Sequence, residues 1–243
     1  MSTQSTSLNV GITKPFPCSY LDNRQETLIM LVDPTINAKT YYPTLLANGF
    51  RRSGDQVYRP HCEFCKACES LRIAVPRFIK SRSQKRLVNK NSVFNIKIAY
   101  SAASHSTEKY FALYQRYINT IHQDGPMFPT SRRQYDDFIH SHWNDAIFIE
   151  IYDQEKLIAV SITDQLITPE SRAWSAFYCF YDPDYTQYSL GKFAVLTQLQ
   201  LAIKYNIDYL YLGYYIESCQ KMNYKNQYKP HQRFIDGEWK SFE

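Results

Sequence analysis

Four cysteines have a spacing that suits metal binding. Cys62, Cys65 and Cys68 follow one another at intervals of three residues, and Cys18 lies well upstream. Two residues between cysteines allow a tight turn to aim successive thiolates at one ion. We therefore expect these four side chains to hold zinc or an iron–sulfur cluster, with His61 as an alternative fourth ligand. The other interpretation is that the cysteines are small buried residues that pack against one another.

A basic stretch follows the cysteines. No acidic residue occurs between Glu69 and Glu108, whereas this stretch contains eight lysines and arginines. Since the net charge is +5, the rest of the chain carries −3 (5 − 8). A localised positive segment on a nearly neutral chain is typical of a surface that binds a polyanion. The residues that we expect to contact nucleic-acid phosphates are Arg77, Arg82, Lys85, Arg86 and Lys90. The alternative is a solvated basic linker.

The elements that must position these residues change in character along the chain. Residues 1–76 are dense in proline and glycine and predict a small, irregular N-terminal domain that contains the cysteines and a short strand at 28–32. Residues 77–94 predict a basic linker or helix. Residues 95–243 alternate between strand and helix patterns and predict a second domain.

The second domain predicts an acetyltransferase-like α+β fold. We expect strands at 95–100, 146–152, 156–162, 173–181 and 208–215, and a polar, loop-like tail from residue 217 onward. We expect helices to begin at Thr107, Ser131 and Ser189. In folds with this order of elements, an acyl donor lies where the central sheet splays apart.

The bulk composition narrows the class of protein. Hydrophobic residues make up 44% and charged residues 21%, which is ordinary for a globular chain and argues against disorder. No apolar run is long enough to span a bilayer, and the chain does not begin with a basic segment followed by an apolar one. We therefore expect a cytoplasmic protein with no membrane partner, whose six cysteines are thiols or ligands and not disulfides.

Several segments together resemble one family. They are Cys18-Ser-Tyr-Leu, Tyr42-Pro-Thr-Leu-Leu-Ala-Asn-Gly49-Phe-Arg51-Arg52-Ser-Gly54, Tyr58-Arg-Pro-His-Cys62-Glu-Phe-Cys65-Lys-Ala-Cys68, Ser81-Arg-Ser-Gln-Lys85-Arg86, His122-Gln-Asp-Gly125-Pro-Met127, Phe180-Tyr-Asp182-Pro-Asp184, Ser189-Leu-Gly191, Tyr209-Leu-Tyr-Leu-Gly213 and Cys219-Gln-Lys221-Met222-Asn-Tyr224-Lys225. Over nearly the whole chain, these segments resemble the aspartate/glutamate leucyltransferases, the bacterial branch of the arginyl-tRNA–protein transferase family. The resemblance implies transfer of leucine from leucyl-tRNA to proteins with N-terminal Asp or Glu, which marks them for degradation. It implies no DNA partner and no energy cofactor.

The implied reaction is aminolysis of an activated ester. It requires positioning, removal of a proton from the attacking amine, and a donor for the developing oxyanion. Asp164 ends a predicted strand, where a carboxylate can act as base or orient the amine; the alternative is a turn-capping Asp. His122 precedes a Gly-Pro turn and can hydrogen-bond the substrate; the alternative is a helix-terminal His.

An acidic acceptor side chain requires cations near the amine. Lys221 and Lys225 are four residues apart, so a helical turn would place both on one face, with Tyr224 beside them. The alternative is a solvated charged face. We expect Arg51 and Arg52 to lie near the 3′ end of the tRNA.

Three other functions remain open. The arginine-transferring branch of the family shares the architecture, so arginyl-tRNA is the alternative donor. A non-catalytic, metal-containing RNA-binding module also fits the basic stretch. A conventional acetyltransferase fits less well, because the chain lacks a Q/R-x-x-G-x-G/A pyrophosphate loop and only Ser189-Leu-Gly191-Lys precedes the predicted helix.

Overall fold

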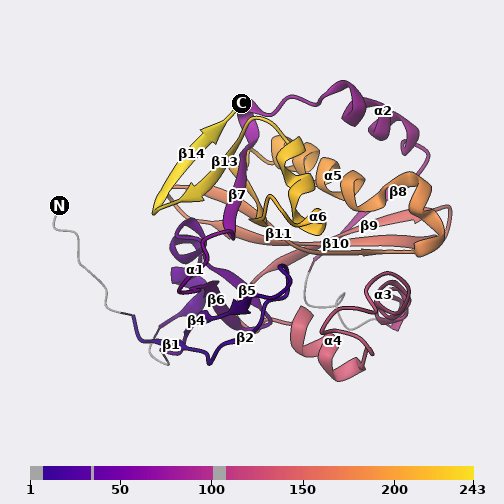
Figure 1. Ribbon diagram of the computed structural model, residues 1–243. Helices are drawn as coiled ribbons and strands as arrows, with labels where there is room; N and C mark the ends of the chain where they lie inside the picture. Colours follow the sequence, from indigo (N-terminus) through magenta and orange to yellow (C-terminus); the bar gives the residue numbers. More distant parts are fainter. Residues whose placement is uncertain (1–7, 34–35, 101–107) are drawn as a thin grey trace.

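One large sheet organises the molecule (Figure 1). The structure is a computed structural model that describes residues 8–33, 36–100 and 108–243. The strands of the large sheet are β7 (Glu69–Ala74), β8 (Asn95–Tyr100), β9 (Ala146–Asp153), β10 (Lys156–Ile167), β11 (Arg172–Tyr181), β12 (Tyr209–Tyr215), β13 (His231–Ile235) and β14 (Glu238–Phe242). They form an eight-stranded sheet in the order β14-β13-β7-β12-β11-β10-β9-β8.

A smaller sheet precedes it along the chain. Its strands are β1 (Val10–Ile12), β4 (Leu28–Leu31), β5 (Arg51–Ser53) and β6 (Gln56–Pro60), in the order β1-β4-β6-β5, and β2 (Phe16–Pro17) pairs with β3 (Gln25–Glu26) in a separate ribbon. The helices are α1 (Ala38–Ala47), α2 (Arg82–Lys90), α3 (Glu108–Ile121), α4 (Arg132–Ile139), α5 (Leu190–Lys204) and α6 (Gln220–Asn223), with 3₁₀ turns η1 (Val75–Arg77), η2 (Pro183–Tyr188) and η3 (Tyr224–Gln227).

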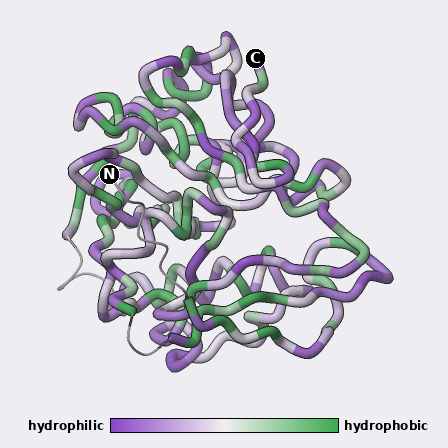
Figure 2. The backbone as a smooth tube through the Cα atoms, turned by 90° about the vertical axis from the view of Figure 1, so that its left-hand side faces the viewer, coloured by the Kyte–Doolittle hydropathy of each residue, from purple (hydrophilic) through white to green (hydrophobic). Residues whose placement is uncertain are grey.

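Helices cover both faces of the large sheet. On one face, Leu196 and Leu199 of α5 pack in a cluster with Leu210 of β12. On the other face, the rings of Tyr110 and Tyr114 of α3 pack against the sheet, since apolar residues recur at intervals of three and four along that helix. In the chain trace, the outlying turns are largely hydrophilic (Figure 2).

Parallel strands β11 and β12 separate after a short pairing. They are joined through α5 and pair only from Ala173 with Tyr209 to Ser175 with Tyr211, although both strands continue further. A register shift between Tyr211 and Gly213 disturbs the pairing of β12 with β7 at the same level. We call the space between β11 and β12 beyond Ser175 and Tyr211 the strand gap.

The two-domain prediction differs from the structure at β7. This strand lies within residues 1–76, yet it pairs with β12 and β13 inside the large sheet. The N-terminal region also contains a regular sheet and not only irregular chain. Dense proline and glycine residues hid the small sheet in the sequence, whereas β7 was missed because its partners lie far along the chain.

The predicted loop-like tail is wrong, because residues 231–242 form the hairpin of β13 and β14. Its turn is Asp236-Gly237, and both residues have positive φ angles, of 52° and 86°. An Asp-Gly pair between two short strands is a strong hairpin signal that the sequence contained. The predicted strands at 146–152, 156–162 and 173–181 are confirmed by β9, β10 and β11.

The predicted helix starts agree with the structure only in part. Ser131 caps α4, since its side chain accepts a hydrogen bond from the Gln134 amide. Ser189 stands at the N-cap position, directly before α5, but has a left-handed conformation and makes no capping bond through its side chain. The expected cap at Thr107 lies outside the described residues. Across the described ranges, every helix is too short or too polar to cross a membrane.

Candidate functional site

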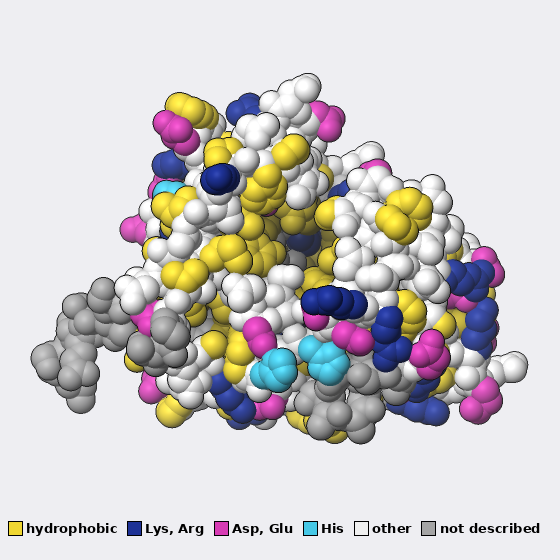
Figure 3. Space-filling model, turned by 90° about the horizontal axis from the view of Figure 1, so that it is seen from below, with side chains coloured by type: hydrophobic (Ala, Val, Ile, Leu, Met, Phe, Trp, Pro, Cys, Tyr) yellow, Lys and Arg dark blue, Asp and Glu magenta, His cyan; other side chains and the backbone are white. Residues whose placement is uncertain are grey.

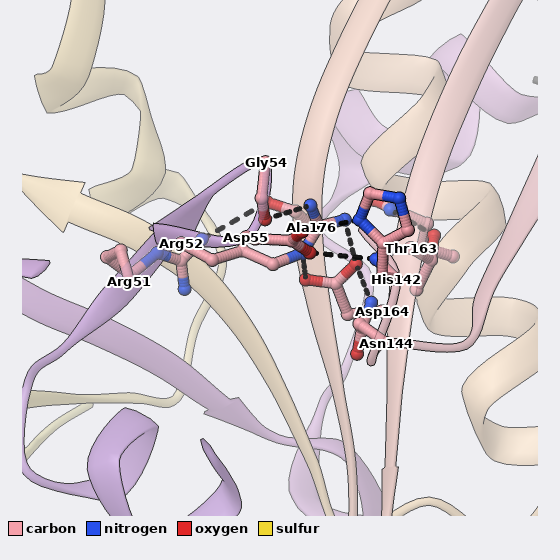
Figure 4. A network of polar contacts seen from close by, with 10 residues as sticks. Arg51, Arg52, Gly54, Asp55, His142, Asn144, Thr163, Asp164 and Ala176 are labelled. Atoms are coloured by element: carbon pink, nitrogen blue, oxygen red, sulfur yellow. Dashed lines mark hydrogen bonds and ion pairs between the residues drawn. The ribbon is translucent and has the colours of Figure 1, made fainter. Parts of the chain in front are cut away.

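Arg52 of β5 crosses from the small sheet to the large one. Its Nη2 and Nε donate to the two carboxylate oxygens of Asp164 on β10, at 2.6 and 2.8 Å. The two side chains are 1% and 0% exposed. Figure 4 shows Arg52, Asp164 and the polar groups around them. The guanidinium carbon also lies 3.8 Å from the ring centroid of Phe177, so Arg52 is held between a carboxylate and an aromatic face.

The sequence predicts that Asp164 acts as a base or orients the attacking amine, but in the structure its carboxylate is enclosed by other side chains. Asn144 adds a third hydrogen bond, from Nδ2 to Oδ1 at 2.7 Å. Both carboxylate oxygens are thus engaged, and the side chain has no exposed surface on which a substrate amine can approach. The geometry makes Asp164 a positioning residue that fixes Arg52, and the role of Asn144 was not predicted from the sequence.

Arg51 lies in the strand gap. Neighbouring residues of a strand point to opposite sides, so Arg51 is directed away from Asp164. Its Nη2 donates to the carbonyl oxygen of Ala176 on β11 at 3.3 Å. A side chain at Gly213 of β12 would begin 3.2 Å from the same nitrogen, so the glycine leaves room for the guanidinium. An isolated glycine in a strand pattern is a sequence signal for such a close approach.

The predicted pairing of Lys221 and Lys225 on one face is wrong. The chain changes from α6 to the 3₁₀ turn η3 between them, which separates their directions. Lys221 is exposed, and its Nζ lies 2.5 Å from Oδ2 of Asp124. Lys225 is buried, and its Nζ donates to the carbonyl oxygen of Tyr214. Burial and then the nearby charge of Arg51 lower the pKa of Lys225 to about 7.

His122 lies close to Lys221. Its Nε2 is hydrogen-bonded to the Tyr117 hydroxyl at 2.9 Å. Burial and the positive charge of Lys221 lower the pKa of His122, which keeps its ring neutral at pH 7. Tyr224 is partly buried near Tyr117, the partner of His122, and burial raises the pKa of Tyr224 to about 12. His122, Lys221 and Tyr224 are therefore brought together at the C-terminal end of α3, although the sequence did not show Asp124 as the connecting residue.

The four cysteines surround one cavity of about 440 Å³. Burial, and then the nearby Cys18, Cys62 and Cys65, raise the pKa of Cys68 to about 12. The number and softness of the thiols suit zinc or an iron–sulfur cluster. In the described part of the chain, however, the His, Cys, Asp and Glu side chains nowhere form a group of three that could hold a single metal ion. His61 and Tyr214 also line this cavity, which places it beside the strand gap.

The basic stretch forms an exposed helix, α2. Ser81 and Gln84 close its first turn through a capping box. The basic residues that α2 exposes are Arg82, Lys85, Arg86 and Lys90. Arg77 precedes this helix, and its Nη2 lies 2.8 Å from Oε1 of Glu243. The helix presents positive charge to solvent, whereas Arg51 and Arg52 are buried elsewhere.

Sequence comparisons now place the chain. A family model described as "Arginine-tRNA-protein transferase, N terminus" matches residues 16–86, and one described as "Arginine-tRNA-protein transferase, C terminus" matches residues 109–235. The "Aspartate/glutamate leucyltransferase" of Aeromonas hydrophila is 46% identical over 241 residues, which cover 99% of this chain and 98% of that protein. The protein of the same name from Pseudoalteromonas atlantica is 44% identical over 232 residues, or 96% of each chain.

Solved structures resemble the chain only weakly. "The structure of L-PGS from Bacillus licheniformis" aligns with a TM-score of 0.47 and 8% identity, over 73% of this chain and 50% of that one, which is too slight a likeness to assign the fold. The family models and the full-length relatives are decisive on their own. The chain belongs to the arginine-tRNA–protein transferase family.

Proposed function

We propose that this protein transfers leucine from leucyl-tRNA to the α-amino group of proteins with N-terminal Asp or Glu. The observation that carries this proposal is the 46% identity, over 99% of the chain, to a relative named for this activity. The buried cations beside the strand gap and the exposed basic helix α2 suit an acidic acceptor and a polyanionic donor.

The reaction forms an amide bond between the acceptor amine and the leucyl carbonyl carbon. The ester bond to the terminal ribose of the tRNA breaks, and the ribose oxygen leaves with the proton that the amine loses. The ester supplies the free energy, so no energy cofactor is required. The active site must mainly hold the two substrates together and assist the proton transfer.

The proposed fold around this reaction is acetyltransferase-like. Antiparallel strands β8 to β11 are followed by a crossover through α5 to the parallel strand β12. The separation of β11 and β12 supports this proposal, because it opens the sheet at the C-terminal ends of two parallel strands. Substrates commonly bind in such a position in open sheets.

We assign the substrates to separate surfaces. The exposed residues of α2, with Arg77, would contact tRNA phosphates. His122, Lys221 and Tyr224 would line the binding site of the acceptor. There the neutral His122 ring can accept a proton from the attacking amine. Arg52, held by Asp164, would support the segment of β5 that reaches the strand gap.

The cysteine cavity is the proposed metal site. Cys18, Cys62, Cys65 and Cys68 would hold zinc or an iron–sulfur cluster, which would tie the chain after β2 to the chain before β7. Metal and sulfide analysis of protein purified without oxygen tests this. We expect bound metal that Cys65→Ser lowers and Cys179→Ser leaves unchanged, since Cys179 lies on β11. Equal metal content in both variants would contradict the assignment.

Transfer assays test the function. The protein is incubated with leucyl-tRNA or arginyl-tRNA and with peptides that begin with Asp, Glu or Lys. We expect leucine on the Asp and Glu peptides. Transfer of arginine would instead support the family's other donor, and tRNA binding without any transfer would support an RNA-binding module.

A further inference from the structure

Arg51 and Lys225 are two buried basic side chains that contact adjacent residues of β12. Arg51 is 8% exposed and lies against Gly213, while Lys225 is 6% exposed and donates to the carbonyl oxygen of Tyr214. Each donates to a main-chain oxygen: Arg51 to Ala176 and Lys225 to Tyr214. Neither forms an ion pair with a carboxylate among residues 8–33, 36–100 and 108–243.

The neighbouring Arg52 shows how this chain balances a buried cation for a structural purpose. Arg52 has a bidentate carboxylate partner in Asp164 and an aromatic face in Phe177. A buried charge without a counter-ion is costly, so buried cations are normally paired. Arg51 is such a buried cation without a carboxylate partner in the described part of the chain, and Lys225 beside it is only partly charged at neutral pH. An anion that arrives with a ligand would supply the missing counter-ion and favour the charged form of Lys225.

We infer that Arg51, together with Lys225, binds the side-chain carboxylate of the acceptor's N-terminal Asp or Glu in the strand gap. This inference rests on the proposed function and deepens it, because it assigns acceptor selectivity to a residue of β5. It also assigns Arg51 to the protein acceptor, whereas the sequence predicted that Arg51 lies near the 3′ end of the tRNA.

The depth of the site favours a carboxylate over an RNA phosphate. Arg51 is only 8% exposed and is enclosed by Ala176 of β11 and Gly213 of β12. A carboxylate requires that only one short side chain reach the guanidinium, whereas contacts with a phosphate backbone are made at exposed basic surfaces such as α2. In the view from below, the surface is hollowed near its middle (Figure 3). Apolar side chains surround this hollow, and Lys or Arg side-chain atoms lie at its floor.

The chemistry of arginine also fits. Since one Nη2 donor is used by Ala176, the guanidinium keeps further donors in a planar fork that matches a carboxylate. An amide of the same shape, as in Asn or Gln, presents one donor to this fork and is rejected. The site therefore predicts discrimination between Asp and Asn, and between Glu and Gln, at the acceptor's first residue.

Acceptor peptides that differ only in Asp or Asn at the first position test the inference. For the wild-type protein, we expect kcat/KM to favour the Asp peptide by at least about tenfold. Arg51→Met should lower kcat/KM for Asp by about tenfold or more, chiefly through KM, and leave kcat/KM for Asn nearly unchanged. Arg51→Lys should restore part of the discrimination.

Two further variants separate binding from structure. Arg59→Met removes an arginine that also donates to a main-chain oxygen, that of Asn48, and should leave the Asp-to-Asn ratio unchanged. Lys225→Met should lower the ratio as Arg51→Met does, and it decides the question if Arg51→Met does not fold.

Each other outcome has a definite meaning. Equal losses for Asp and Asn peptides in Arg51→Met would make Arg51 a structural residue and overturn the inference. Weaker tRNA binding with an unchanged ratio would assign it to the RNA and overturn it too. If the wild-type protein transfers to no peptide, the proposed function itself fails; if Arg51→Met and Lys225→Met transfer with the wild-type ratio, only this inference fails.

Discussion

Asp164→Asn separates a positioning role from a catalytic one. In the wild-type protein, the carboxylate accepts hydrogen bonds of 2.6, 2.7 and 2.8 Å from Arg52 and Asn144. An asparagine at this position keeps the shape and loses the charge. Whichever way its amide is turned, its NH₂ group meets a donor, since Arg52 donates to both oxygens and Asn144 to one. Breaking a buried ion pair costs about 3–5 kcal/mol, so we expect the free energy of unfolding to fall by about 3 kcal/mol or more.

Urea unfolding followed by tryptophan fluorescence measures this loss, and the chain supplies a matched control. Asp145 pairs with Lys39 at 2.6 Å, but the two side chains are 63% and 61% exposed. Because exposed pairs contribute about 0–1 kcal/mol, Asp145→Asn should change the free energy of unfolding by less than about 1 kcal/mol. The reasoning is refuted if Asp164→Asn is as stable as Asp145→Asn while kcat falls by about a hundredfold or more. That result would return Asp164 to the role of a base.

Two further predictions concern the surface. Replacing Lys85 and Arg86 by Ala should weaken tRNA binding at low salt and reduce the slope of log affinity against log salt by about 1–2, because each lost phosphate contact accounts for about 0.7–0.9 of that slope; an unchanged slope would remove α2 from the tRNA surface. The hydrogen bond from His142 to Asp55, and then the Asp55 charge, raise the pKa of His142. Its contribution to stability should be complete below the ordinary histidine pKa of about 6.5 and disappear as the pH rises through the raised value. His142→Asn should abolish this pH dependence of the unfolding midpoint, and a curve that still matches the wild type would contradict it.

The sequence predicted the elements of the second domain well where the pattern was local. Apolar periodicity and turn residues predict the hairpin of β9 and β10 and the long helix α5. Strand β7 could not be predicted in this way, because its pairing partners lie more than a hundred residues away along the chain. A strand that is completed by distant partners leaves little trace in its own few residues.

The site could be predicted by residue type but not by role. The cysteines do gather around one cavity, and α2 is exposed and basic, because spacing and charge are properties of adjacent residues. The roles of Asp164, Arg51 and Lys225 depend on burial and on partners from other strands. Sequence alone could not show that Asp164 neutralises Arg52, or that Arg51 and Lys225 lie without a carboxylate in the described structure.

Competition between two donors tests the central claim most directly. The wild-type protein is given equal amounts of leucyl-tRNA and arginyl-tRNA, with one peptide that begins with Asp and one that begins with Asn, and the peptides are analysed by mass spectrometry. The account predicts leucine on the new N-terminus of the Asp peptide, with little on the Asn peptide. Arginine on the product, or no extended peptide while tRNA remains bound, would contradict it.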